Sequence, residues 1–356
     1  MVSAEQVRTA LSRVQDPELG RDIVALGMVR DVQVSQGNVS LTLALTTASC
    51  PLRGQLVQQA REAVSAIEGV CEVRVSVTAM TEEERQRLFA GLRQERPRPT
   101  NRIGRVVAVM SGKGGVGKSF VSAMLAVAWQ RQGKRVGILD ADITGPSIPR
   151  MFFAAIPRPE ATDEGLLPAV TGSGIEVMSI NLLLPRDDEA VIWRGPLISG
   201  AIRQFWEEVA WGALDYLVVD LPPGTSDASL TVVQAIPLNG VVLVTSPQAL
   251  SGMVVRKAAA MVRKLNVPLV GVVENMAYAV CPRDGERIEV FGPSHAASLA
   301  ADLGTDLLGS LPLSSTIATH ADAGSIEAYP GREFAAIADA VASRLTERHS
   351  EPLVKP

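Results

Sequence analysis

The run Gly112-Lys113-Gly114-Gly115-Val116-Gly117-Lys118-Ser119 fits G-x-x-x-x-G-K-[ST], a pattern in which backbone amides surround the phosphates of a nucleotide. The residues before it, Arg105 to Ser111, are mostly apolar and predict a buried strand. Those after it, Val121 to Gln132, have the apolar face of a helix. The pattern requires this order of strand, glycine-rich turn and helix, because the helix N-terminus then faces the phosphates. The sequence therefore predicts a nucleotide-binding α/β domain.

The loop contains a second lysine, Lys113, directly after its first glycine. Lys118 alone suffices to hold the phosphates in its own subunit, so the extra cation suggests a site that a partner subunit completes. A glycine-rich turn with incidental lysines is the alternative interpretation. The agreement of the motif with its flanking strand and helix argues against that alternative.

Two short apolar strands end in carboxylates. Val136 to Leu139 precedes Asp140 and Asp142, and Tyr216 to Val219 precedes Asp220. Open parallel sheets bind ligands at the carboxyl ends of their strands, so these groups lie where a nucleotide is expected. Asp220 and the serine that ends the loop are the expected holders of Mg²⁺. A turn or helix-cap role is the alternative for each aspartate, and it stays open for Asp140.

The chain as a whole has 356 residues, 47% of them apolar, and a net charge of -4. This length predicts one large domain and one small one. The sequence has no long basic run and no apolar stretch of membrane-spanning length, so we expect neither nucleic acid nor a membrane as a partner. Three widely spaced cysteines do not suggest a disulfide framework, and we expect a cytoplasmic location.

A polar, proline-containing segment at residues 91–103 predicts a linker. It separates a small α+β domain, residues 1–90, from a P-loop ATPase domain, residues 104–348, and a tail follows at 349–356. In the large domain, near-continuous apolar runs alternate with helical stretches. This alternation predicts a doubly wound, mostly parallel sheet with helices on both faces.

Alternating and helical patterns also define the elements of the small domain. We expect helices at Ala4–Val14 and Leu52–Ile67, and strands at Val29–Val34, Val39–Leu45 and Val70–Val77.

The phosphate loop resembles the variant Walker A loop of the MinD/ParA/nitrogenase-iron-protein class of ATPases. Four later segments are similar to those of the Mrp-type iron–sulfur cluster carriers within this class: Asp140–Ser147, Trp193–Pro196, Asp220–Thr225 and Glu274–Met276. The N-terminal part is similar to the small cluster-assembly domain that precedes many bacterial Mrp proteins, through Asp16–Glu18, Leu26–Gly27 and Thr46–Pro51.

This resemblance implies a homodimer with two ATP molecules at its interface, which hydrolyses them slowly and transfers a [4Fe–4S] cluster to apo iron–sulfur client proteins. The backbone around the phosphates would be that of Gly112, Gly114, Gly115, Val116 and Gly117. Matching positions also imply that Lys113 enters the partner's site and neutralises developing charge there, as an arginine finger does. Asn275 would hydrogen-bond the adenine.

The remaining catalytic roles follow from the same resemblance. Lys118 would contact the β- and γ-phosphates, and Ser119 would ligate Mg²⁺. Asp142 would orient the attacking water. Asp220 would sense the γ-phosphate through the metal, which it holds through water. Each role is positional or electrostatic, which suits phosphoryl transfer.

The cysteines are where the sequence departs most from the family pattern. Many members carry Cys-Pro-x-Cys after the Asn-Met segment, whereas this chain has Cys281-Pro282-Arg283-Asp284. A [4Fe–4S] cluster takes four thiolates, and paired motifs in this dimer supply two. Three outcomes stay open: Asp284 completes the ligand set, Cys50 of each chain completes it, or Cys281 no longer binds a cluster. Cys50 matches the reactive cysteine of the small domain, and a small buried hydrophobe is its alternative.

Other departures leave the expected phosphate and metal ligands in place, so ATP binding is expected. They are Phe120 for threonine, Thr144 for tyrosine, Ser226 for glycine, and Pro293-Ser294-His295 for a glycine-rich stretch. Cys71 is expected to pack in the core. The histidines show no metal-ligand spacing and favour solvated or capping roles at His295, His320 and His349.

Two functions compete with a cluster carrier. A metal-free switch of the MinD/ParA kind, which docks or positions a protein partner, is favoured by Asp284 at the second cysteine position. An electron donor like the nitrogenase iron protein also needs a bridging cluster, so Asp284 weakens that interpretation equally.

Overall fold

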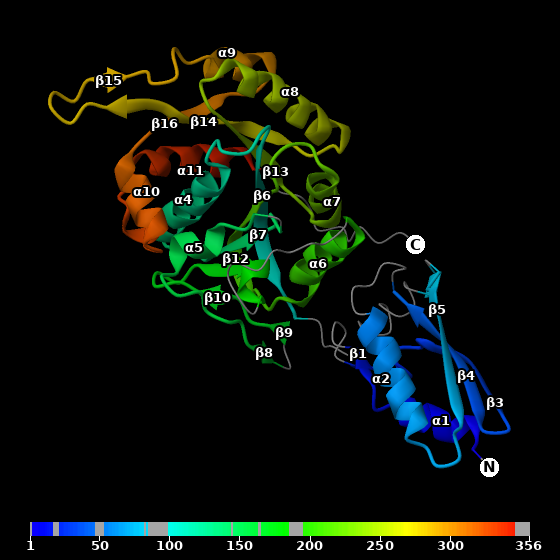
Figure 1. Cartoon of the computed structure of the whole chain (residues 1–356). Helices are drawn as coiled ribbons and strands as arrows, with labels where there is room; N and C mark the ends of the chain where they lie inside the picture. The colour runs from blue at the N-terminus through cyan, green and yellow to red at the C-terminus, as the bar shows by residue number, and fades with distance from the viewer. Residues whose placement is uncertain are drawn as a thin grey trace. The chain divides into compact units, whose positions relative to one another are not determined.

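The computed structural model describes residues 2–16, 21–46, 53–81, 83–84, 99–143, 145–162, 165–184 and 195–345. The chain forms two compact units, Met1–Arg96 and Pro97–Pro356 (Figure 1). Four residues singled out from the sequence lie outside the described residues: Cys50, Thr144, Trp193 and His349.

The N-terminal unit is a three-stranded sheet covered by helices, in the strand order β3-β4-β5. Its elements are α1 (Ala4–Leu11), β1 (Gln15–Asp16), β2 (Arg21–Asp22), β3 (Val29–Ser35), β4 (Asn38–Leu45), α2 (Arg53–Ser65) and β5 (Glu72–Ala79). Strands β3 and β4 are antiparallel, and β4 and β5 are parallel with α2 between them in the chain. Alternate residues of β4, such as Leu41 and Leu43, pack with Leu56, Ala60 and Val64 of α2 in one apolar core.

The large unit contains a nine-stranded sheet in the order β10-β11-β7-β12-β6-β13-β14-β15, and β16 also pairs with β14. These strands are β6 (Arg102–Ser111), β7 (Val136–Asp140), β10 (Ala169–Val170), β11 (Glu176–Ser179), β12 (Ala213–Asp220), β13 (Gly240–Thr245), β14 (Leu269–Val280), β15 (Arg287–Ile288) and β16 (Leu307–Pro312). Only the pairs β10–β11 and β14–β15 of this sheet are antiparallel. A short separate ribbon joins β8 (Ala161–Thr162) to β9 (Gly165–Leu166).

Helices cover both faces of this sheet (Figure 1). They are α4 (Lys118–Arg131), α5 (Ile148–Phe152), α6 (Gly195–Glu208), α7 (Asp227–Ala235), α8 (Ala249–Lys264), α9 (Ala296–Asp302), α10 (Ser315–Asp322) and α11 (Glu333–Arg344), with 3₁₀ turns at Ile180–Leu182 and Ile326–Ala328. Strand β6 shows the alternation: Val107 and Val109 pack with α4, α5 and α11, whereas Ala108 and Met110 pack with α6, α7 and α8. The predicted fold class, a doubly wound and mostly parallel sheet preceded by a small α+β unit, is confirmed.

The carboxyl ends of the central strands meet at one edge of the sheet. There Asp220 of β12 is paired with Asp140 of β7, and Thr245 of β13 is paired with Glu274 of β14. Ser111, the last residue of β6, lies between these two pairs in the strand order. Strand β6 begins at Arg102, inside the segment expected as the end of the linker. The sheet edge thus gathers the groups that the sequence placed near a nucleotide.

Candidate functional site

The phosphate loop joins β6 to α4. Where the loop packs against neighbouring elements, only glycine fits, because a Cβ atom would clash with them. A Cβ atom on Gly112 would lie 2.6 Å from the backbone of Val254 in α8, and one on Gly117 would lie 2.1 Å from Nδ2 of Asn275. Gly117 also has a left-handed φ of 78° and forms the N-cap of α4. Around Gly114 the described residues place nothing within 4 Å of an added Cβ. The loop is therefore tightly packed on one side and open where backbone amides can meet phosphate.

The carboxylate of Asp220 accepts hydrogen bonds from three side chains at the start of α4. Its Oδ2 accepts from Nζ of Lys118 at 2.7 Å and from Oγ of Ser119 at 2.6 Å. Its Oδ1 accepts from Oγ of Ser122 at 2.6 Å. The carboxylate is fully buried, and the Lys118 side chain is 6% exposed. A buried ion pair with this many hydrogen bonds holds the lysine, the serine and the carboxylate in one fixed group.

Sequence reasoning missed Ser122, although a signal was present. Ser119 and Ser122 are three residues apart in a helix and therefore lie on one face. Helix α4 begins at Lys118, three residues before the predicted start, so the loop's final residues already have helical geometry.

Asp140 is wholly buried and ties the following loop to the sheet. Its carboxylate accepts from the backbone amides of Asp142 at 3.1 Å and Ile148 at 3.2 Å, and from Oγ of Ser179 at 3.3 Å. Burial, reinforced by the neighbouring Asp220 carboxylate, raises the pKa of Asp140 to about 8. These contacts describe a group that shapes the loop, which is the turn-type role left open for Asp140.

Asp142 lies beside this group, 9% exposed. Its Oδ1 accepts from the backbone amide of Gly145 at 3.1 Å. A carboxylate fixed at the strand ends, close to Asp140 and Asp220, suits the orientation of a small polar molecule.

Lys113 contacts its own subunit in this structure. Its Nζ donates to Oε1 of Gln248 at 2.6 Å, and its carbonyl accepts from Oγ of Ser111 at 2.9 Å. Gln248 directly precedes α8 and was not singled out from the sequence. The two residues meet because β13, which leads to α8, lies next to β6 in the sheet.

Asn275 is buried against the phosphate loop. Its Nδ2 donates to the carbonyl of Val116 at 2.9 Å, and its side chain is 3% exposed. The residue after it, Met276, has a left-handed φ of 59°, at the point where the register of β14 against β16 shifts. The structure thus brings Asn275 to the phosphate loop, and its hydrogen bond to the adenine stays a prediction.

Cys281 lies on a hairpin formed by the end of β14 and by β15, which extends from the sheet (Figure 1). Its amide donates to the carbonyl of Glu286 at 2.9 Å, and its thiol lies close enough to the Asp284 carboxylate to affect the pKa of that group. The backbone amide of Glu286, and then this thiol, hold the pKa of Asp284 below its usual value. Exposed apolar side chains flank the cysteine, with Val280 52% and Ile288 51% exposed.

The described residues contain no group of three or more His, Cys, Asp or Glu side chains placed to hold a metal ion. Cys281 and Asp284 are brought together, and Cys50 lies outside the described part of the chain. The structure thus places one thiol, that of Cys281, beside the Asp284 carboxylate at the hairpin.

The prediction for Cys71 was wrong, because this residue is exposed. Alternation along β5 would turn the side chain of Cys71 toward the core. However, the strand starts only at Glu72, which is paired with Asn38. Cys71 lies beyond that last pair, where its amide donates to the carbonyl of Gly37 in the hairpin turn at 2.8 Å.

Several departures from the family pattern have a structural explanation. Phe120 is buried and contacts Phe334 edge-to-face, with ring centroids 5.5 Å apart. Ser226 is the N-cap of α7 and accepts from the amide of Ser229. His295 is exposed before α9 without a capping hydrogen bond from its side chain, and Nδ1 of His320 lies 3.3 Å from Oγ of Ser325.

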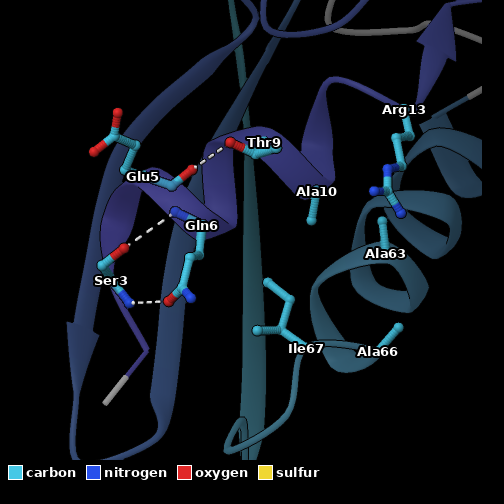
Figure 2. Close-up of a pocket in the computed structure, with 9 residues that line it drawn as sticks. All are labelled: Ser3, Glu5, Gln6, Thr9, Ala10, Arg13, Ala63, Ala66 and Ile67. Carbon is cyan, nitrogen blue, oxygen red and sulfur yellow. Dashed lines mark hydrogen bonds between the residues drawn. The ribbon is translucent and has the colours of Figure 1, made fainter.

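A groove of about 470 Å³ lies between α1 and α2 in the N-terminal unit (Figure 2). Its polar end is a capping box, in which Ser3 and Gln6 bind each other's backbone amides at 2.9 and 3.2 Å. These polar atoms are engaged in holding α1, so the groove has the features of a helix–helix junction and not of a catalytic site.

Each of the two parts of the chain matches a known protein family. A family model described as the NUBPL iron-transfer P-loop NTPase matches residues 102–346, and one described as an iron–sulfur cluster assembly protein matches residues 4–77. An iron–sulfur cluster carrier protein of Synechocystis is 42% identical over 317 residues, which cover 88% of each chain. One from Deinococcus radiodurans is 40% identical over 338 residues, covering 94% of this chain and 93% of the relative.

A solved structure agrees with the P-loop part. The nucleotide-binding protein of Archaeoglobus fulgidus, in complex with ADP, is 47% identical with a TM-score of 0.59 and covers 65% of this chain and 91% of its own. In the described part of our chain, no helix has the length and apolar character needed to cross a membrane. Together the family models and relatives span nearly the whole chain, and the P-loop family matches the part that contains the phosphate loop. The chain therefore belongs to the iron–sulfur cluster carrier family of ParA-type P-loop NTPases.

Proposed function

We propose that this protein is a homodimeric carrier that binds and slowly hydrolyses ATP and transfers a [4Fe–4S] cluster to apo iron–sulfur proteins. The observation that carries the proposal is the buried group in which Lys118, Ser119 and Ser122 all bind Asp220 beside an open phosphate loop. Membership of the carrier family supports the choice of cargo.

The ATP site uses the residues at the start of α4. The amides of the loop and of the helix N-terminus receive the phosphates, and Lys118 contacts the β- and γ-phosphates. Ser119 would hold Mg²⁺ through its hydroxyl, and Asp220 would hold it through a water molecule. Mg²⁺, when bound, neutralises charge on the phosphate oxygens. Asp142 orients the attacking water, and Asn275 hydrogen-bonds the adenine.

The dimer completes this site through Lys113. Its ammonium exchanges the contact with Gln248 for the phosphates of the partner's nucleotide, where it offsets negative charge. Hydrolysis then acts as a switch, because the nucleotide state changes how well the two chains fit each other.

The cluster is cargo held at the hairpin. Cys281 supplies one thiolate per chain, and Cys50 or Asp284 completes the ligand set. Cys281 and Asp284 lie close together on the hairpin, which favours a mixed thiolate and carboxylate site. Such a site binds iron less tightly than four thiolates, which suits a protein that must release its cargo.

A second function rests on the same pair of residues. Asp284 occupies the position of the motif's second cysteine and lies close to the thiol of Cys281, so a metal-free switch that docks a protein partner is the alternative. For either function we propose an assembly-type domain at 1–90, a linker at 91–103, an ATPase domain at 104–348 and a tail at 349–356, in a protein of the cytoplasm.

Anaerobic reconstitution with iron and sulfide tests the cargo. Iron and sulfide are counted per dimer for the wild type, Cys281→Ala and Cys50→Ala. We expect about four irons per dimer in the wild type and loss with Cys281→Ala. Loss in both variants places Cys50 in the ligand set, whereas loss in Cys281→Ala alone favours Asp284.

Two results would overturn parts of this proposal. A wild type that retains no iron would assign the protein to the metal-free switches. Lys118→Ala is expected to abolish ATP hydrolysis, and a rate equal to the wild type would remove the proposed ATPase activity.

A further inference from the structure

The hairpin that carries Cys281 is an excursion of the chain with a defined base. Strand β14 stays paired with β16 as far as Tyr278, and the chain returns to the large unit's core at Ser294, two residues before α9. Near its tip the hairpin is exposed, and Cys281 lies between exposed neighbours. The base is held by the pairing of Tyr278 with Pro312 and by the contact of Ser294 with Glu274, and both contribute to the position of Cys281.

A buried carboxylate closes this base. Glu274 is fully buried, and both of its oxygens lie 2.8 Å from Oγ of Ser294, which donates to them. Oγ of Ser294 also accepts from the amide of Ala296 at 3.2 Å, so one hydroxyl fixes both the end of the hairpin and the start of α9. Oε2 of Glu274 accepts in addition from Oγ of Ser310 at 3.0 Å.

The two serines approach Glu274 from different elements. Ser310 lies on β16, directly opposite Glu274 in the parallel pairing of β14 and β16. Ser294 is joined to Glu274 only through the excursion of the chain that carries Cys281. Hydrogen bonds to a buried charged group are stronger than neutral ones, and a buried carboxylate that loses a donor is poorly solvated. The contact with Ser294 therefore resists opening of the hairpin at its base.

The base also touches the nucleotide loop. Asn275, the next residue after Glu274, donates to the carbonyl of Val116 at 2.9 Å. Glu274 thus binds the residue at which the hairpin ends, and the next residue, Asn275, binds the phosphate loop.

We propose that Glu274 is a positioning residue that holds the Cys281 hairpin at a fixed place beside the phosphate loop by binding the hydroxyl of Ser294. This deepens the proposed function, because the position of Cys281 matters for cargo only if the hairpin binds a cluster. Ser294 belongs to the stretch that departs from the family's glycine-rich pattern, and the contact with Glu274 gives it a role.

Hydrogen exchange on the full-length protein tests the anchor without any iron present. Amides of residues 277–292 are followed in the wild type, Ser294→Ala and Ser310→Ala. Each variant removes one hydroxyl donor from the same carboxylate, but only Ser294 ends the hairpin, so Ser310→Ala is the matched control. We expect Ser294→Ala to speed exchange in the hairpin about tenfold, the effect of losing one charge-assisted hydrogen bond. Ser310→Ala should leave hairpin exchange within about twofold of the wild type.

A conservative variant separates positioning from general destabilisation. Ser294→Thr keeps the hydroxyl, and its extra methyl can point to solvent because Ser294 is exposed. We expect it to restore wild-type exchange in the hairpin. Unchanged hairpin exchange in Ser294→Ala, an equal increase in Ser310→Ala, or no recovery in Ser294→Thr would each overturn the proposal.

The link to cargo has its own measurement. After reconstitution, we expect Ser294→Ala to lose bound iron faster than the wild type to an added chelator, while its kcat for ATP stays within about twofold. Iron lost at the wild-type rate would overturn the link to cargo. A wild type without iron would instead refute the carrier function, and the exchange experiment would still decide whether Glu274 anchors the hairpin.

Discussion

Ser122 shows how one hydroxyl supports the ATP site from outside the motif. It is fully buried and donates to the Asp220 oxygen that neither Lys118 nor Ser119 uses. Ser122→Ala leaves that oxygen short of a donor, so the carboxylate can turn away from the place where it holds Mg²⁺. A hydrogen bond to a charged group contributes about 1.5–3 kcal/mol, so we expect kcat for ATP hydrolysis to fall at least about tenfold at saturating Mg·ATP.

A matched control keeps the same chemical change away from the site. Ser343 is an exposed serine of α11 whose hydroxyl donates to the carbonyl of Ala340 at 3.0 Å. Ser343→Ala should hydrolyse ATP at the wild-type rate. Wild-type kcat in Ser122→Ala as well would show that Asp220 needs only its contacts with Lys118 and Ser119.

Glu176 gives the large unit a pH-dependent stability. Burial raises its pKa to about 7, partly opposed by Arg135, and its Oε2 has no hydrogen-bond partner among the described residues. The folded pKa is above the unfolded value, so the protonated form favours folding and stability falls as pH rises through about 7. Glu176→Gln removes this loss. We expect its Tm to exceed that of the wild type by about 2–4 °C at pH 8, for a screened effect near 1 kcal/mol, and by less at pH 5.

Thermal melts at the two pH values, with the exposed Glu289→Gln as control, measure this difference. The control should melt with the wild type at both values. A Tm gain for Glu176→Gln that is equal at pH 5 and pH 8 would contradict titration of Glu176 in this range.

At the scale of elements, the sequence predicted which residues lie at strand ends but not which strands lie side by side in the sheet. Asp142 and Asp220 could be found because each follows an apolar run, and the carboxyl ends of parallel strands share an edge. The contact between Lys113 and Gln248 joins residues 135 positions apart and depends on β13 lying beside β6. The sequence carries no local signal for that order. The contact of Glu274 with Ser294 and Ser310 was hidden for the same reason.

Strand boundaries account for the error at Cys71. Alternation alone places that residue on the inner face, but burial also requires a paired neighbour and a covering helix. The pairing of β4 with β5 begins one residue later, at Asn38 and Glu72. A period-two pattern predicts which face a residue takes and not where the covered part of the sheet ends.

The start of α4 depends on a glycine with a left-handed backbone. Gly117→Ala forces φ of 78° on a residue with a Cβ, which would also lie 2.1 Å from Nδ2 of Asn275. Left-handed backbone costs an alanine about 1–2 kcal/mol before the clash is counted. We therefore expect Gly117→Ala to lower Tm by several degrees and to weaken ATP binding at least about tenfold.

Gly114→Ala is the matched comparison for stability. Nothing described lies within 4 Å of its added Cβ. Its Tm should stay within about 1 °C of the wild type. Equal destabilisation by both substitutions would show that the packing of Asn275 against the loop does not set the requirement for glycine at position 117.

At the scale of the whole molecule, the described apolar cores are separate. One core draws its buried residues from Val7 to Met80, and the two cores on the faces of the large sheet draw theirs from Val106 to Leu345. Each unit therefore has its own hydrophobic core, as expected for an assembly-type domain attached to an ATPase. In the proposed dimer, Lys113 is the group that links one chain to the partner's phosphate loop.

Substitution of Lys113 tests whether one chain completes the nucleotide site of the other. In one chain its ammonium binds Gln248 at 2.6 Å, and in the proposed dimer it leaves Gln248 for the partner's phosphates. Lys113→Ala should therefore abolish hydrolysis while keeping ATP binding, because Lys118 and Ser119 remain. Lys118→Ala is expected to be inactive for the opposite reason, since its own site should not hold the phosphates.

Mixing the two inactive variants decides which subunit Lys113 serves. In a mixed dimer, the Lys113→Ala chain has an intact Lys118, and the Lys118→Ala chain supplies Lys113 across the interface, so one complete site forms. Random exchange gives half of all dimers this composition, each with one of two sites, so we expect about a quarter of the wild-type ATPase rate. Each variant mixed with itself is the control and should stay inactive. A mixture that also stays inactive would show that Lys113 acts within its own chain, and the contact with Gln248 would then be part of the working site.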